Sequence, residues 1–184
     1  MNGKLVRILL LVVLASLLAG QAFAADEYNY TGLKKCKMCH KPAKIGNQFG
    51  VWEKGPHAKA FADLSSEAGL AKAKELGVEN PAEADACLKC HSTGHAAKAE
   101  AKAKLLVEKG VTCEACHGPG SGYMKKKTMV GITAGTIDGA TVGLIPQTEA
   151  VCLNCHTADN PGHKGEFDFE KFVKQIAHPL PEKG

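Results

Sequence analysis

Eight cysteines, arranged as four copies of one short pattern, constrain this chain more than any other feature of its sequence. In each copy two residues separate the cysteines and a histidine follows at once. The copies are Cys36-Lys-Met-Cys39-His40, Cys87-Leu-Lys-Cys90-His91, Cys113-Glu-Ala-Cys116-His117 and Cys152-Leu-Asn-Cys155-His156. In such a CxxCH motif the two thiols bond to the vinyl groups of one haem, and the histidine is the proximal ligand of its iron.

Three other uses of paired cysteines compete with this interpretation. A disulfide scaffold, a zinc ribbon and a redox dithiol all use cysteines at such spacings. None of them requires a histidine after every second cysteine, and the chain has only 8 histidines in 184 residues. The sequence therefore predicts four covalently bound haem c groups as its cofactors.

The first 24 residues have the pattern of a signal peptide. Two basic residues precede an uncharged, almost wholly apolar run at 8–20, and Ala22-Phe23-Ala24 matches a small-x-small cleavage site. The apolar run is short against the roughly 20 residues that span a bilayer. We expect cleavage near Ala25, a periplasmic or otherwise exported product without a stable membrane anchor, and one tetrahaem cytochrome c domain over 25–184.

Charge and composition limit the partners of that domain. Removing Lys4 and Arg7 from 23 basic residues leaves 21 against 19 acidic ones, a formal charge of +2. The lysines are mostly spread along the chain, and aromatic residues make up only 5% of it, too few for base-stacking platforms. We therefore expect redox proteins as partners and no nucleic acid, and leave oligomerisation open.

Local patterns predict a mainly α fold with long loops, compact, and with four haems as its core. Ala58 to Leu76 is rich in helix formers and stops before Gly77, a favourable residue just past a helix end. Pro81 suits the first turn of a short helix leading into the second motif. Ala96 to Lys109 predicts another helix.

The end of the chain predicts its best-defined helix. Asp168 is the expected N-cap, Phe167 and Phe172 form a hydrophobic staple, and an apolar stripe ends at Ile176. Residues 118–150 are rich in Gly and Thr and predict turns and loops with at most one short hairpin. Within them, Gly118-Pro119-Gly120 is expected to let the backbone pass close to a porphyrin.

Four histidines remain outside the motifs, as many as there are sixth coordination positions. They are His57, His95, His163 and His178. If all four bound iron, every haem would be low-spin and low in potential, as suits an electron carrier. A histidine outside a motif is more often a surface or hydrogen-bonded residue, so equal numbers do not settle the ligands.

Several segments together resemble the cytochrome c554 family, the tetrahaem carrier of ammonia oxidisers and its relatives in metal-reducing and other anaerobic bacteria. The resemblance is carried by Lys34-Lys35-Cys36 through His40, Trp52 with His57-Ala58-Lys59-Ala60, Cys87 through His91 with Ser92-Thr93-Gly94, the run from Gly110 to Gly120, and a closing Phe-rich helix with His178. It implies that His57 is the distal ligand of the third haem and that His178 caps the fourth.

The chain also departs from that family. The archetype has a histidine a few residues after the third motif that ligates the first haem, but Tyr123-Met124-Lys125-Lys126 stands here instead. The first haem must then use another histidine, use Met124 or Met129, or stay open. The family also has a five-coordinate second haem, which implies an open iron here. The family pattern supports neither His95 nor His163 as a ligand.

Three functions follow, of which we expect the first. The chain is an electron carrier rather than an enzyme, with no catalytic residue to assign. Alternatively, a five-coordinate haem reduces nitric oxide or a nitrogen oxyanion. In the third, the chain is a subunit of an extracellular cytochrome filament, in which His95 or His163 binds iron in the next subunit.

Overall fold

The computed structural model describes residues 28–180, apart from 98, 103, 106 and 163–165. The expected signal peptide and His163 lie outside these residues. The helices are α2 (Leu33–His40), α3 (Gln48–Lys54), α4 (Ala60–Asp63), α5 (Glu67–Glu75), α6 (Asp85–His91), α7 (Ala99–Lys102), α8 (Cys113–His117), α9 (Lys126–Thr133), α10 (Glu149–Cys152) and α11 (Phe169–Ile176). Short 3-10 turns lie at Ala43–Ile45, His57–Lys59, Val107–Lys109 and Gly139–Val142.

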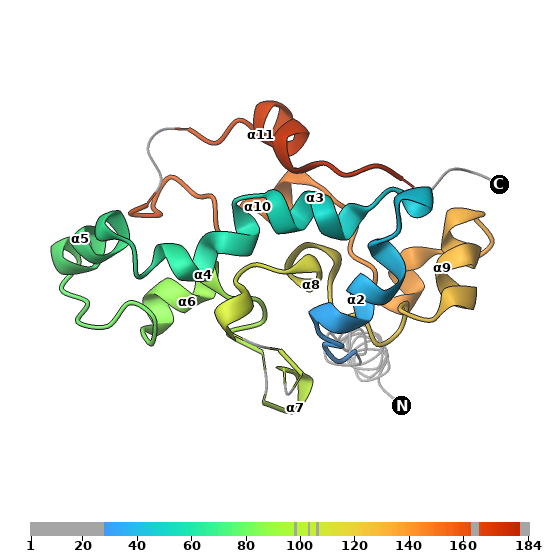
Figure 1. Cartoon of the computed structure of the whole chain (residues 1–184), viewed down its shortest axis with the longest axis horizontal. Helices are drawn as coiled ribbons and strands as arrows, with labels where there is room; N and C mark the ends of the chain where they lie inside the picture. Colours follow the sequence, from blue (N-terminus) through green and yellow to red (C-terminus); the bar gives the residue numbers. More distant parts are fainter. Residues whose placement is uncertain (1–27, 98, 103, 106, 163–165, 181–184) are drawn as a thin grey trace, which may run out of the picture.

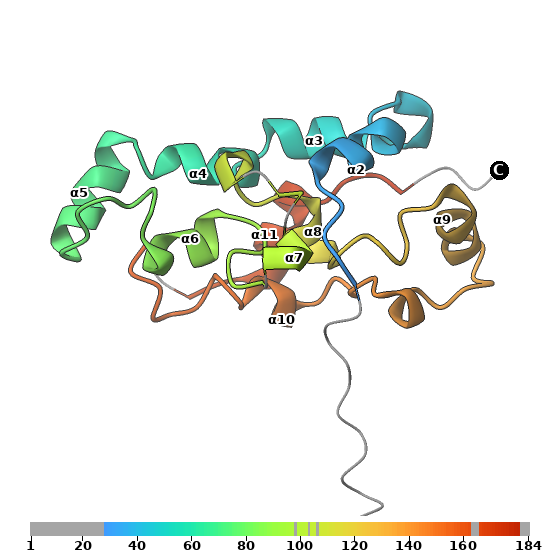
Figure 2. The ribbon, with the colours of Figure 1, turned by 90° about the horizontal axis from the view of Figure 1, so that it is seen from below.

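The described part of the chain contains no β-strand, which confirms the expected mainly α class and leaves no hairpin at 118–150. In the same part, no helix combines the length and apolar character that a bilayer crossing needs. Figures 1 and 2 show α3, α4 and α5 following one another along the long axis of the molecule. In both views α5 lies at one end and α9 at the other.

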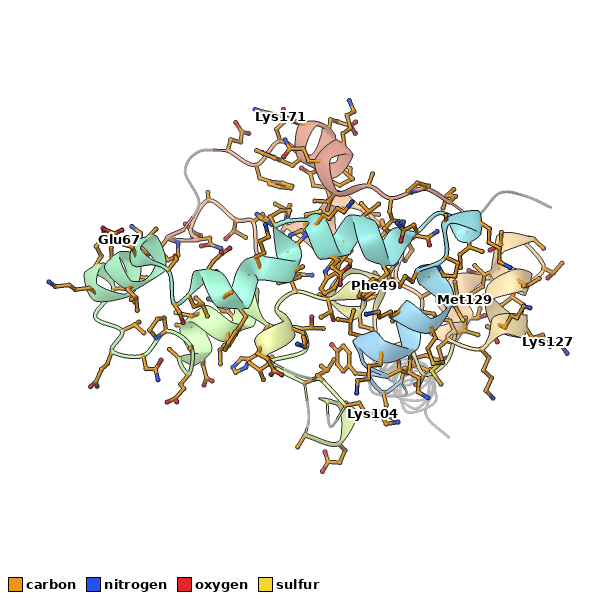
Figure 3. The ribbon with its side chains drawn as sticks, viewed as in Figure 1. Phe49, Glu67, Lys104, Lys127, Met129 and Lys171 are labelled. Atoms are coloured by element: carbon orange, nitrogen blue, oxygen red, sulfur yellow. The ribbon has the colours of Figure 1, made fainter. Side chains whose placement is uncertain are left out.

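The apolar core formed by side chains is small. The buried apolar residues of the described chain are Phe49, Leu64, Ala73, Leu88 and Tyr123. Phe49 lies where α3 faces α2 (Figure 3), and the Nζ atom of Lys37 is 4.8 Å from the centre of its ring. Because so few side chains are buried, the helices need another source of apolar surface, as expected for a core of porphyrins.

The expected helix over 58–76 is interrupted. The chain forms α4, breaks at 64–66 and restarts as α5, because the Ser66 hydroxyl caps the new helix by accepting a hydrogen bond from the Gly69 N–H at 3.1 Å. The predicted end is confirmed. Gly77 has a φ of +67°, and the N–H of Val78 donates to the Ala73 carbonyl at 2.8 Å, which completes a Schellman motif.

Two other sequence expectations hold only in part. Pro81 lies in a turn, and the helix that carries the second motif begins later, at Asp85. The run 96–109 forms α7 and the turn Val107–Lys109, rather than one continuous helix over its described residues. Non-local contact contributes to the difference, since the Tyr30 N–H donates to the Ala101 carbonyl at 2.9 Å.

The last helix agrees with its prediction. α11 begins after Asp168, whose carboxylate accepts a hydrogen bond from the Lys171 N–H at 3.0 Å. The rings of Phe167 and Phe172 stack with centres 5.5 Å apart, as a hydrophobic staple requires.

The segment 118–150 contains a helix that its composition did not indicate. α9 forms despite threonine, valine, isoleucine and glycine within it. Its Gly131 is buried, and a Cβ there would lie 2.6 Å from the side chain of Ile137, so the turn after the helix packs directly onto its backbone. Tertiary packing therefore overrides the weak helix propensity of this segment.

Candidate haem centres

Each CxxCH motif lies on a helix or at its end. The first three motifs are carried by α2, α6 and α8, and the fourth begins on α10 and continues into a turn. In that turn the His156 N–H still donates to the Cys152 carbonyl at 2.9 Å. Residues three and four apart share a helix face, so each motif can present two thiols and a histidine together. All eight cysteines are free thiols, so the disulfide alternative does not describe this structure.

The first and third motifs lie side by side. The thiols of Cys36 and Cys113 are hydrogen-bonded to each other. This hydrogen bond raises the pKa of Cys36, helped by burial, and lowers that of Cys113. Two cysteines from different motifs that meet in this way would bring the attachment edges of two bound haems close together.

The second and fourth motifs form an equivalent pair. Burial and the neighbouring Cys90 thiol raise the pKa of Cys155 to about 12, and the two thiols are hydrogen-bonded. Asn160 joins the same motifs, because its amide donates to the Cys155 carbonyl at 2.6 Å and lies 3.9 Å from the Cys90 sulfur.

The two pairs are also near each other. Cys116 of the third motif is close enough to Cys152 of the fourth for their charges to interact, which together with burial raises the pKa of Cys116. The motifs therefore follow one another in the spatial order first, third, fourth, second. Figures 1 and 2 show the same order for their helices α2, α8, α10 and α6 along the long axis.

Two of the remaining histidines face motif histidines. The ring centres of His57 and His156 are 6.0 Å apart, and those of His117 and His178 are 5.8 Å apart. Two imidazoles that bind one metal from opposite sides, each through a bond of about 2 Å, have their ring centres roughly 6 Å apart. Both pairs therefore have the spacing of an iron held between two histidines.

These ring contacts differ from the pairing that the resemblance implied. His57 faces the histidine of the fourth motif and His178 that of the third, whereas the resemblance implied the reverse. The closing helix explains the difference. Phe167, just before α11, stacks on the ring of His156 with centres 5.0 Å apart, so α11 starts at the fourth motif and its far end carries His178 to the third.

The chemistry of these histidines fits a metal-bound role. Burial lowers the pKa of His57, and burial together with His178 and His40 lowers the pKa of His117 to about 4. Both rings are therefore neutral at neutral pH, which is the form that binds a metal. The Nδ1 atom of His178 is buried without a hydrogen-bond partner, a polar group that a coordinated iron or a relaxed ring would satisfy.

The histidines of the first two motifs are oriented through Nδ1. The Nδ1 atom of His91 lies 2.5 Å from the Ala60 carbonyl oxygen, and that of His40 lies 3.2 Å from Oε1 of Gln48. A carbonyl oxygen can only accept, so Nδ1 carries the proton and the lone pair is left on Nε2. An imidazole held in this way presents Nε2 to a metal.

Residues between the second and third motifs hold His57 in place. The Val111 N–H donates to the His57 carbonyl at 3.1 Å, and the Val111 carbonyl accepts from the Trp52 indole at 2.8 Å. Gly110 has a φ of +69°, and a Cβ there would lie 2.9 Å from the His57 oxygen. Thr93, just after the second motif, donates from its hydroxyl to the Gly110 carbonyl at 3.1 Å.

A buried glutamate inside the third motif escaped the sequence analysis. Glu114 is 2% exposed, and its carboxylate accepts hydrogen bonds from the N–H groups of Thr31, Gly32 and Gly120 at 2.7–2.8 Å and from the Thr31 hydroxyl at 3.1 Å. It ties the segment before the first motif to the third. Its position between haem cysteines was visible in the sequence, but its burial was not.

The less certain candidates have other surroundings. The Nε2 atom of His95 lies 2.8 Å from the Asp85 carboxylate, as expected of a surface histidine. Tyr123, at the place of the missing family histidine, is buried, and its hydroxyl donates to the Gly118 carbonyl at 2.6 Å. Its neighbour Met124 is 43% exposed. Gly118 itself approaches the backbone of Gly143, whose oxygen would lie 2.8 Å from a Cβ.

Paired CxxCH helices, neutral facing histidines and a small side-chain core together define a c-type cytochrome with covalently bound haem. Residues 35–118 match the family described as cytochrome c554 and c-prime. The chain is also 34% identical over 122 residues to cytochrome c-554 of Nitrosomonas europaea, which covers 62% of this chain and 48% of that protein. The chain thus spans about half of that relative's length. No solved structure matches it significantly.

Proposed function

We propose that this chain is an exported, four-haem c-type cytochrome that carries electrons between redox proteins. The observation that carries the proposal is the continuous spatial order of the four motifs, with thiol contacts from the first to the third and from the fourth to the second. Bound haems supply reversible one-electron chemistry at iron. An array that runs along the long axis suits entry of electrons at one end and exit at the other.

The protein groups have distinct duties in this proposal. The cysteines of each motif hold a haem covalently, and His40, His91, His117 and His156 are the proximal ligands. His178 completes the third site and His57 the fourth. Such bis-histidine irons are low-spin and leave no position for a substrate. The distal ligands at the first and second motifs stay unassigned, with His95, His163, Met124 and Met129 as the candidates.

Surface charge supports a partner-docking role for the end of the molecule that carries the first motif. Residues 28–52 contain five lysines and no acidic residue, and 120–137 contain three more lysines and again no acid. Lys127 points outward from α9 at the same end (Figure 3). By contrast, residues 63–85 hold six acidic residues and two lysines. An acidic redox protein would therefore be attracted to the first-motif end.

The experiment is expression in a host that attaches haem c, followed by two measurements on the purified protein. Mass spectrometry and a pyridine haemochrome assay should give four haems per chain and a start near Ala25. Low-temperature EPR of the oxidised protein should show low-spin signals, and His57→Ala should convert one haem to high-spin. A haem content below four, or no spectral change in that variant, contradicts the proposal.

An open surface depression beside the second motif motivates one second candidate, a haem enzyme acting on a small molecule. The depression has a volume of about 580 Å³ and is lined by residues of α6 and by His95 with its neighbours. Carbon monoxide or nitric oxide should then shift the spectrum of the reduced protein, and Lys89→Leu at the edge of this depression should alter the binding rate. A spectrum unmoved by either gas excludes this candidate.

A further inference from the structure

Gln48, the first residue of α3, connects the first motif to the segment that carries His178, which the sequence places far apart. Gln48 is only 7% exposed. Its Nε2 atom donates to the carbonyl of Ile45 and, at 2.8 Å, to that of Pro179, while Oε1 lies 3.2 Å from Nδ1 of His40. One amide therefore contacts the proximal histidine of the first motif and the residue directly after His178.

The orientation of this amide follows from its partners. The oxygens of Ile45 and Pro179 can only accept hydrogen bonds, so the atom between them must be the NH₂ group of Gln48. The other amide atom is then the carbonyl oxygen, and His40 must donate to it from Nδ1. The lone pair of His40 is thereby left on Nε2, the atom that faces a metal in an imidazole held by its other nitrogen.

The backbone conformation at Gly46 lets the turn before α3 approach the C-terminal segment around Pro179. Gly46 has a φ of +99°, a conformation that favours glycine. A Cβ at this position would lie 2.6 Å from Nε2 of Gln48 and 2.8 Å from the Pro179 oxygen. The turn before α3 therefore admits the C-terminal segment only because residue 46 has no side chain.

The fixed carbonyl of Pro179 is adjacent in sequence to a candidate axial ligand. The ring of His178 lies 5.8 Å from that of His117, and its own Nδ1 atom is buried without a hydrogen-bond partner. No contact in the described chain orients the His178 ring through that nitrogen. Its position depends instead on the backbone that carries it, and Gln48 holds that backbone.

We propose that Gln48 is a positioning residue for two haem sites at once. Through Oε1 it sets the proton position and the ring orientation of His40 at the first motif. Through Nε2 it anchors the segment that brings His178 to the third motif. This inference rests on the proposed function, since it needs haem at both motifs.

The main test compares Gln48→Leu with the wild-type holoprotein by EPR and by spectroelectrochemical titration. We expect a new high-spin signal from the third haem and altered potentials at the first and third haems, with the other two unchanged. Loss of a hydrogen-bond partner behind a metal ligand weakens the metal–ligand bond about 10- to 100-fold. Because cyanide competes with His178 for the third iron, the affinity of that iron for cyanide should rise by about the same factor. Gln175→Leu, at an exposed glutamine on α11, should change none of these values.

Two further variants separate the roles. Gln48→Glu keeps an acceptor for His40 but loses the donor to Pro179, so it should raise the high-spin signal like Gln48→Leu. His178→Ala removes the distal ligand directly, and adding Gln48→Leu to it should give no further high-spin iron. If Gln48→Leu fails to load haem, Gln48→Glu alone decides between the outcomes.

The two proposals can fail separately. If the wild-type protein binds fewer than four haems, or lacks a low-spin third haem, the proposed function fails before any variant is compared. If the wild type is low-spin at that site and Gln48→Glu has the same spectrum and cyanide affinity, the assignment of Gln48 is wrong and the proposed function stands. Additional high-spin iron in the double variant would also contradict the assignment.

Discussion

Paired thiols lie at both junctions, but a buried carboxylate also joins the first and third motifs, whereas a partly buried amide also joins the second and fourth. Glu114 accepts hydrogen bonds from three backbone N–H groups at the first junction and is only 2% exposed. Asn160 makes the corresponding connection at the second, where the chain is only partly buried. Four copies of one motif thus lie in two different environments, so the CxxCH pattern alone does not determine how rigidly a haem site is held.

The largest effect is expected at the first junction. Glu114→Ala would leave the N–H groups of Thr31, Gly32 and Gly120 buried without an acceptor. Unsatisfied buried donors cost about 1–3 kcal/mol each, and partial relaxation gives an expected loss of about 3–5 kcal/mol in the free energy of unfolding. Denaturant unfolding of the holoprotein measures this loss. A change below 1 kcal/mol would show that the carboxylate does not hold the first junction together.

A smaller effect on stability is expected at Gly110, which lies between the second and third motifs and contacts His57. Gly110→Ala places a methyl group against the His57 oxygen and forces alanine into a left-handed conformation, for an expected loss of about 2–3 kcal/mol. It should also weaken the His57 contact with the fourth site and add high-spin iron.

Gly77 provides a matched control for that variant. It has nearly the same φ, +67°, but no atom within 4 Å of a Cβ. Gly77→Ala should cost about 1 kcal/mol and leave the spectrum unchanged. If Gly110→Ala and Gly77→Ala lose equal amounts of stability, the close approach of residue 110 to His57 contributes nothing to the free energy of unfolding.

At the second junction we expect a weaker response. Asn160→Ala removes the hydrogen bond to the Cys155 carbonyl, at a cost of about 1 kcal/mol because water can reach this site. Asn154→Ala, at an exposed neighbour, serves as the control in the same unfolding measurement. A loss as large as that of Glu114→Ala would remove the proposed contrast between the two junctions.

Sequence reasoning located the caps of α11 because their signals are local, and the same kind of local signal predicts the proximal histidines. Asp168 with Phe167 and Phe172 forms a capping pattern whose members are only five residues apart. Two of the four histidines outside the motifs proved to face motif histidines, although the resemblance implied the opposite partners for His57 and His178.

What the sequence did not reveal depends on contacts between distant segments. Gln48 and Glu114 have ordinary sequence surroundings, and their importance appears only when residues 131 and 83 positions away come into contact with them. The helix α9 was missed for the same reason, since packing of Ile137 on Gly131 outweighs local propensity. The motifs therefore predict the cofactors, whereas the pairing of the motifs in space needs the fold.

The smallest expected effect concerns the surface charge that distinguishes the two ends. Lys35→Glu reverses an exposed charge beside the first motif and should slow electron exchange with an acidic flavodoxin several-fold at low ionic strength. Stopped-flow kinetics would measure the bimolecular rate. Since the Debye length is about 10 Å at 0.1 M salt and shorter above it, the difference should shrink as salt is added.

Lys74→Glu is the matched control, because Lys74 is also exposed but lies on α5 at the opposite, acidic end. If partners dock near the first motif, Lys74→Glu should leave the bimolecular rate of electron exchange nearly unchanged. The two variants should also have the same stability. Equal slowing by the two substitutions would mean that net charge, rather than its location, controls the encounter. Slowing by Lys74→Glu alone would place the docking site near the second motif, so that this partner exchanges electrons at the opposite end of the line of motifs.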